Sequence, residues 1–180
     1  IMPEGDKRYA DLPIIVPEIQ GTIKQSKGYT ILDVGGEDTG ARVLSYLENA
    51  FVNLESYQLL VVVNRNRPFT SDAAGTLKIL KAIEKSSKLK TTGLISNTHL
   101  MEDTTLEVVL KGYEMASEVA KEIGVPIYFT TVHEKFMEEA KKLIPTPLLP
   151  IKRVLLPPHL KHLKVGVESK NILASLSDWE

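Results

Sequence analysis

Polar and glycine residues follow several apolar runs of the chain, and their types suit phosphate and nucleotide chemistry. Asp33 ends one such run, and Gly36 follows it three positions later. A carboxylate there can hold Mg²⁺ directly or through water, and a glycine lets a backbone N–H approach a phosphate without a Cβ in the way. The same residues equally suit a tight turn between a strand and a helix, because a D-x-x-G pattern is short and common.

Two arginines and an asparagine follow the next two apolar runs, residues 57–63 and 92–96. Arg65 and Arg67 either grip phosphates or belong to a solvated charged loop. The amide of Asn97 either pairs with the edge of a purine base or satisfies the backbone of a turn. Each residue type fits a nucleotide, and each has an ordinary structural explanation beside it.

Small hydroxyl side chains close the following run, which spans residues 126–130. Thr130 and Thr131 either line a pocket for a base or ribose, or simply finish a strand and cap a helix. The histidines carry no accompanying carboxylate or cysteine pattern, so we expect surface positions rather than a metal site. They are His99, His133, His159 and His162.

Alternating strand-like and helix-like segments must position these residues. Short apolar or β-branched runs predict the strands, and apolar residues three and four positions apart predict the helices. The alternation predicts an α/β fold with a mainly parallel sheet and helices on both faces, with ligands at the carboxyl ends of the strands. The expected strands are residues 13–16, 29–34, 57–63, 92–96, 126–130 and 151–156. The expected helices are residues 43–54, 73–83, 105–123 and 134–143. For the third of them we expect Thr104 and Glu107 to form a capping box at its start and Gly124 to end it.

Composition excludes several classes of function. The 180 residues carry a formal net charge of −1, which gives no bulk attraction to nucleic acid. The chain has no cysteine, so disulfides and thiolate chemistry are excluded, as a reducing cytoplasm would favour. No apolar run approaches the roughly 20 residues that span a bilayer. The chain opens on Ile1 rather than Met, and we expect it to begin partway through a longer protein.

One motif that this chemistry needs is missing from the sequence. A Walker A loop has the pattern G-x-x-x-x-G-K-[ST], in which backbone N–H groups and a lysine hold the phosphates. No glycine is followed directly by lysine anywhere in the 180 residues. The residues given therefore contain no phosphate cradle of this kind.

The ordered set of segments resembles the MinD/ParA and cobyrinic-acid-synthase-like group of P-loop ATPases. The resemblance covers roughly residues 1–155 and rests on residues 10–13, 29–36, 60–68, 93–100 and 126–132. It implies a P-loop NTPase-like, three-layer α/β/α fold that binds ATP and Mg²⁺. It also implies that Asp33 lies near Mg²⁺, that Gly36 faces the γ-phosphate and that Asn97 contacts the base. Members of the group form nucleotide-dependent homodimers and act on a protein partner.

The resemblance also implies that the phosphate-binding loop lies upstream, on a central strand whose loss exposes its neighbours' edges. We therefore divide the chain into a partial P-loop NTPase-like domain, residues 1–155, and an extension, residues 156–180. The first hypothesis is a nucleotide-binding switch protein that hydrolyses ATP only when this loop is supplied. The second is a non-catalytic scaffold that binds a protein partner. The third is a different doubly wound enzyme, flavodoxin-like or binding a small molecule, in which Asp33 is only a turn residue.

Overall fold

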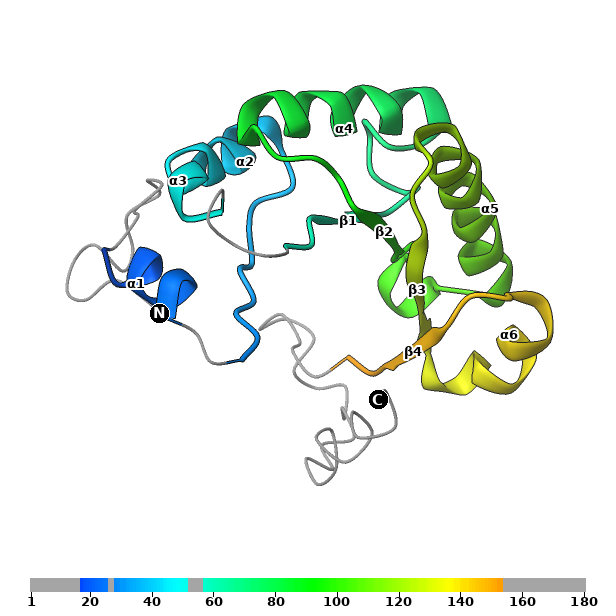
Figure 1. The fold of residues 1–180 in the computed structure, drawn as a ribbon. Coiled ribbons are helices and arrows are strands. Elements are labelled where there is room, and N and C mark those ends of the chain that lie inside the picture. Colours follow the sequence, from blue (N-terminus) through cyan, green and yellow to red (C-terminus); the bar gives the residue numbers. More distant parts are fainter. Residues whose placement is uncertain (1–16, 26–27, 52–56, 154–180) are drawn as a thin grey trace, which may run out of the picture.

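A four-stranded, wholly parallel β-sheet forms the centre of the protein (Figure 1). The computed structural model describes residues 17–25, 28–51 and 57–153. The strands stand side by side in the same order as in the sequence. They are β1 Leu60–Val63, β2 Gly93–Ser96, β3 Ile127–His133 and β4 Leu148–Ile151. The predicted α/β class and the predicted parallel pairing are confirmed.

The helices that connect these strands cover one face of the sheet. They are α4 Ala73–Ser87, α5 Leu106–Ile123 and, after the short turn η3 Glu134–Phe136, α6 Met137–Leu143. The register aligns Val63, Ser96 and Thr130 in one row, and Val63 packs against α4 and α5. Right-handed crossovers between strands that advance in one direction place every connecting helix on the same side. Helices were expected on both faces, but among the described residues they pack on this face alone.

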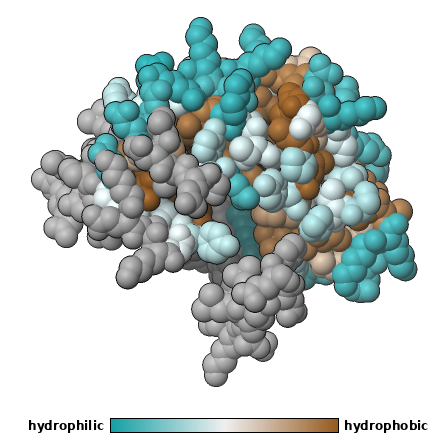
Figure 2. Space-filling view, viewed as in Figure 1, coloured by the Kyte–Doolittle hydropathy of each residue, from teal (hydrophilic) through white to brown (hydrophobic). Residues whose placement is uncertain are grey.

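Two adjoining apolar clusters fill the space between the sheet and its helices. In the first, Leu94 of β2 is fully buried against α4 and α5. In the second, Val132 of β3 packs against Val109 of α5 and Ala140 of α6. The helix α5 contributes to both clusters because its apolar residues recur every three or four positions. Figure 2 shows polar side chains over the outer surface of α4 and hydrophobic atoms beneath them.

The C-terminal cap of α5 agrees with the prediction, whereas its N-terminal cap differs from it. The N-cap is Thr105, whose hydroxyl accepts a backbone N–H three residues further on at 3.3 Å. Thr104, expected to cap with Glu107, instead accepts the N–H of Leu100 at 2.8 Å and so belongs to the preceding turn. Gly124 ends the helix with a φ of 71°, the left-handed conformation that glycine adopts without strain.

Three short helices precede the sheet, and the first and third of them enclose a small apolar cluster. They are α1 Pro17–Gln25, α2 Asp38–Ser45 and α3 Glu48–Phe51. The prediction of a single helix over residues 43–54 is wrong, because α2 ends at Ser45 and α3 begins at Glu48. The chain turns between them, since α2 packs along α4 whereas Leu47 packs against Ile23 of α1. The helix α1 was not predicted. Lys88, at the end of α4, forms an ion pair with Glu48 of α3 at 2.6 Å.

Residues 29–34, predicted as the first strand, form no strand. Exposure nevertheless alternates along them: Leu32 joins the cluster with α1 and α3, whereas Ile31 and Asp33 point away and are exposed. Ile31 is 91% exposed and Tyr29 is fully exposed. The residue types suit a strand, but a strand also needs a neighbour for its N–H and C=O groups. No other described segment pairs with them.

The remaining strands differ from the prediction mainly at their ends. β1 is shorter than residues 57–63, and β3 continues three residues beyond the expected end at residue 130. The last strand lies earlier than residues 151–156, because the ladder with β3 already begins where Thr130 N–H donates to Pro147 C=O at 2.9 Å. The short strand expected at residues 13–16 and the extension at 156–180, with its two histidines, lie outside the described residues. None of the described helices is long and apolar enough to span a bilayer.

Candidate functional site

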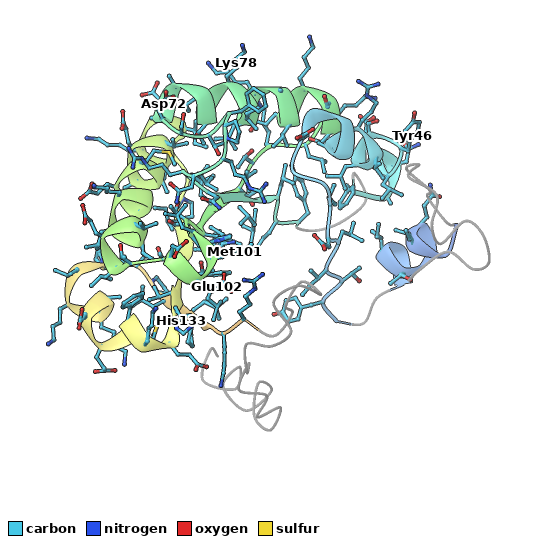
Figure 3. The ribbon with its side chains drawn as sticks, turned by 180° about the vertical axis from the view of Figure 1, so that it is seen from behind. Tyr46, Asp72, Lys78, Met101, Glu102 and His133 are labelled. Carbon is cyan, nitrogen blue, oxygen red and sulfur yellow. The ribbon has the colours of Figure 1, made fainter. Side chains whose placement is uncertain are left out.

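The carboxyl ends of the parallel strands meet at one end of the sheet, and most predicted contact residues lie there. Arg65 and Arg67 follow β1, Asn97 follows β2, and Thr131 lies in the second half of β3. In open parallel sheets this end is where ligands bind. Figure 3 labels Met101 and Glu102, from the turn η2 Met101–Asp103 that follows β2, and His133, at the end of β3.

Hydrogen bonds tie the loop after β1 to the loop after β2. The backbone N–H of Arg65 donates to Thr98 Oγ1 at 2.9 Å, and Asn66 Nδ2 donates to the carbonyl of His99 at 3.2 Å. Thr98 is itself buried against Gly112 of α5, where an added Cβ would lie only 2.2 Å from the threonine side chain. The two loops are therefore held in one arrangement by α5, with Arg65 half-buried and Arg67 exposed.

Asn97 and Thr131 are brought into direct contact. Thr131 Oγ1 donates to Asn97 Oδ1 at 2.6 Å, and the backbone N–H of Asn97 donates to Val63 C=O at 2.8 Å. Ser96 and Thr130 are paired in register and fully buried towards the helices. Because side chains alternate along a strand, Asn97 and Thr131 project to the opposite face, which no described helix covers. Both side chains are half-buried there.

Thr130 does not belong to this pair. Its side chain is fully buried on the helix-covered face, and its hydroxyl lies 3.2 Å from that of Thr146. A one-residue step along a strand reverses the face that a side chain occupies. The structure therefore places Thr131 beside Asn97 and Thr130 on the other side of the sheet, so Thr130 is not positioned to contact a ligand that Asn97 touches.

A charged group that the sequence analysis did not anticipate adjoins these loops. Arg153, just after β4, forms an ion pair with Glu102 of η2. Burial lowers the pKa of His99 below its ordinary value of 6.5, and the positive charges of Arg67 and Arg153 lower it further. His99 is half-buried rather than at the surface as predicted. Neither Arg153 nor Glu102 belongs to a motif, so only the folding of β4 beside β3 reveals their proximity.

Asp33 and Gly36 lie on the unpaired segment rather than at the end of a strand. Asp33 is exposed, and a Cβ added to Gly36 would meet nothing within 4 Å. Close packing instead requires a glycine at Gly40 in α2, because an added Cβ there would lie 2.6 Å from the carbonyl oxygen of Gly35. Within the described residues, no three histidine or acidic side chains group closely enough to hold a metal ion.

Comparison of the chain with family models, with curated proteins and with solved structures finds no match in any of the three.

Proposed function

We propose that this protein is an ATP-binding switch protein of the MinD/ParA-like group, and that a strand bearing a phosphate-binding loop docks at the free edge of β1. The proposal includes the three-layer P-loop fold, a cytoplasmic location, nucleotide-dependent homodimerisation and action on a protein partner. One observation carries the proposal. Two strand-like segments, β1 and residues 29–34, lie on the same side of the sheet, and no described strand pairs with the outer edge of β1 or with residues 29–34.

The free edge of β1 supports this proposal. The carbonyl of Val63 accepts a hydrogen bond from the loop after β2, so the alternation of the backbone turns the N–H and C=O groups of Leu60 and Val62 outward. The Val62 side chain is 56% exposed. An all-apolar strand without proline or charge is typical of a strand buried inside a parallel sheet, and it is unusual at an edge.

The second unpaired segment lies on the same side of the sheet (Figure 1). Residues 29–36 lead directly into α2, and α2 packs along α4, the helix that follows β1. One apolar strand inserted between this segment and β1 would pair with both and would cover Ile31. Its carboxyl end would then lie next to Asp33 and Gly36, as the group resemblance implies.

The residues present fit part of a Mg²⁺–ATP site. Asn97 and Thr131 offer polar groups for a nucleobase on the open face, and Asp33 offers one exposed carboxylate for a metal ion. Arg65 and Arg67 add positive charge at the strand ends. No glycine–lysine pair is present for the triphosphate, so we assign no hydrolysis step to these residues.

The test is to compare the 180-residue chain with the same chain extended by the sequence that its gene encodes before residue 1. We expect that sequence to contain a strand followed by G-x-x-x-x-G-K-[ST], and the extended protein to bind Mg²⁺–ATP in isothermal titration calorimetry. Asp33→Asn should weaken binding in Mg²⁺ far more than binding in EDTA, whereas Glu37→Gln, an exposed carboxylate nearby, should change neither. A complete reading frame without the motif, or an extended protein that binds no ATP, overturns the proposal.

The same open edge favours a second candidate, a non-catalytic scaffold that binds a protein partner. Exposed strand edges accept an extended segment of another protein by backbone pairing. If the extended chain binds no nucleotide, this candidate remains, and it predicts that Val62→Lys abolishes partner binding while Lys78→Ala, on the outer surface of α4, has no effect (Figure 3).

A further inference from the structure

The face of the sheet that points away from α4, α5 and α6 is apolar along most of its length. Leu94 of β2 and Val132 of β3 are fully buried towards the helices, and Leu148 of β4 packs on that same side. Side chains alternate along a strand, so the residues next to these point to the other face. We call this other side the open apolar face, and its apolar residues are Leu60, Val62, Ile95, Phe129, Leu149 and Ile151.

The side chains of the open apolar face form a continuous surface across the strands. The register pairs Val62 with Ile95 and Ile95 with Phe129, which makes one row over three strands. Val62 is 56% exposed, and the other two are half-buried. A Cβ added to Gly93 would lie 2.4 Å from the ring of Tyr128, so this ring also lies on the open side, over the glycine. Wholly parallel sheets are normally buried on both faces, which indicates that a further segment covers this one.

Residues 171–180 carry an apolar stripe that suits such a surface. Ile172, Leu173, Leu176 and Trp179 recur at the spacing i, i+1, i+4 and i+7, which places them on one side of a helix. The positions on the opposite side are polar or charged, except for one alanine. The first residue of the segment is an asparagine, which is a preferred N-cap. The sequence therefore predicts an amphipathic helix here.

The connection from the sheet to this segment is long enough for the segment to reach the open apolar face. The strand β4 ends at Ile151, whose side chain lies on that face. Residues 152–170 can span up to about 60 Å when extended, whereas a strand of the length of β3 measures only about 23 Å. A helix over residues 171–180 would be about 15 Å long, and four neighbouring strands extend over about 14 Å.

We propose that residues 171–180 form a helix whose apolar side packs on the open apolar face of the same chain, over β2, β3 and β4. This inference goes beyond the proposed function and does not depend on nucleotide binding. Covalent attachment favours this segment over a separate protein, because a tethered segment has an effective concentration in the millimolar range. Phe129 and Leu149 then lose their contact with water.

The experiment uses the fluorescence of Trp179, the single tryptophan of the 180-residue chain. We expect the native chain to emit at a shorter wavelength than the chain unfolded in urea, because the indole is removed from water. Quenching by iodide should be several-fold weaker in the native chain than in the unfolded one. Neither value should change on dilution, because the contact lies within one chain.

Substitutions on the two sides of the contact test where the indole is buried. Leu149→Lys puts a charge under the helix and should shift the emission to that of the unfolded chain, while the far-ultraviolet circular dichroism keeps the signal of the folded sheet. Leu176→Lys, in the segment itself, should give the same shift and leaves the described core intact. Leu143→Lys changes a leucine that is 55% exposed at the end of α6, outside the open apolar face, and should leave the emission unchanged.

Three other outcomes overturn the proposal. The first is a native emission equal to that of the unfolded chain. The second is a short-wavelength emission that appears only with vesicles of anionic phospholipid, which would mean that the segment binds a membrane, or that fades on dilution, which would mean that it packs on a second copy. The third is an emission that neither Leu149→Lys nor Leu176→Lys changes.

Discussion

The two sides of the sheet differ in how far they are complete. From β2 to β4, the strands pair with one another, and Leu94 and Val132 are fully buried beneath α4, α5 and α6. On the β1 side, α1 and α3 enclose a small cluster, while Ile31 and Val62 remain largely exposed. Segments of similar composition thus form a strand in one place and none in the other, because a strand forms only where another strand supplies its hydrogen-bonding partner.

Truncation of a core leucine should show the largest difference between the two sides. Leu94→Ala removes a fully buried side chain between β2 and α5 and should lower the free energy of unfolding by about 2–5 kcal/mol. Leu32→Ala should cost clearly less, because the Leu32 side chain is only half-buried against the cluster near α1. Urea denaturation measures both, and equal losses would mean that the cluster before β1 is as tightly packed as the main core.

Glycine substitutions should have opposite signs on the two sides. Gly112→Ala places a methyl group against Thr98 and should destabilise the protein by about 1–3 kcal/mol, while also disturbing the loop that holds Arg65. Gly21→Ala lies within α1 and meets nothing within 4 Å, so it should stabilise that helix by about 0.5–1 kcal/mol. Thermal unfolding curves give both values. A destabilising Gly21→Ala would show that α1 has a close neighbour.

Removal of the cap of α5 should have a smaller effect. Thr105→Ala deletes the hydroxyl that accepts a backbone N–H of the first turn and should cost about 1 kcal/mol. Thr105→Ser keeps that acceptor and should cost much less. Hydrogen exchange should locate the loss in the first turn of α5, and a loss spread over α1 to α3 instead would show that the two sides are coupled.

The pH dependence of stability should single out the β2–β4 side. Burial and two nearby arginines lower the pKa of His99, so the folded protein favours the neutral ring. The contribution of His99 is therefore fully present above pH 6.5 and is lost as the pH falls through its folded pKa. His99→Gln should flatten the stability profile below pH 6.5. An unchanged slope in His99→Gln would place the titrating group elsewhere.

The sequence predicted those parts of the fold whose partners are close in the chain. The apolar stripe of α5, its Gly124 end and the alternation that gives a parallel sheet are all local patterns. Residues 29–34 satisfied the same local pattern, yet no neighbouring strand is present to pair with them. Asn97 and Thr131 lie on neighbouring strands, so their contact could be expected. That Thr130 faces the helices, away from Asn97, depends on the register of β2 with β3, which contains an irregularity. The approach of Arg153 to Glu102 depends on where β4 begins, which proline-rich sequence did not reveal.

The two outer edges of the sheet also differ in the backbone donors that they offer. Thr130 N–H donates to Pro147 C=O, so alternation turns Leu148 and Pro150 of β4 outward, and proline has no N–H. That edge offers a single donor within β4, whereas β1 offers two complete N–H and C=O pairs. While no other strand is docked at β1, two copies that join through β1 use up the edge that is best able to bind. Association through the described sheet edges should stop at a closed pair rather than grow into a fibre.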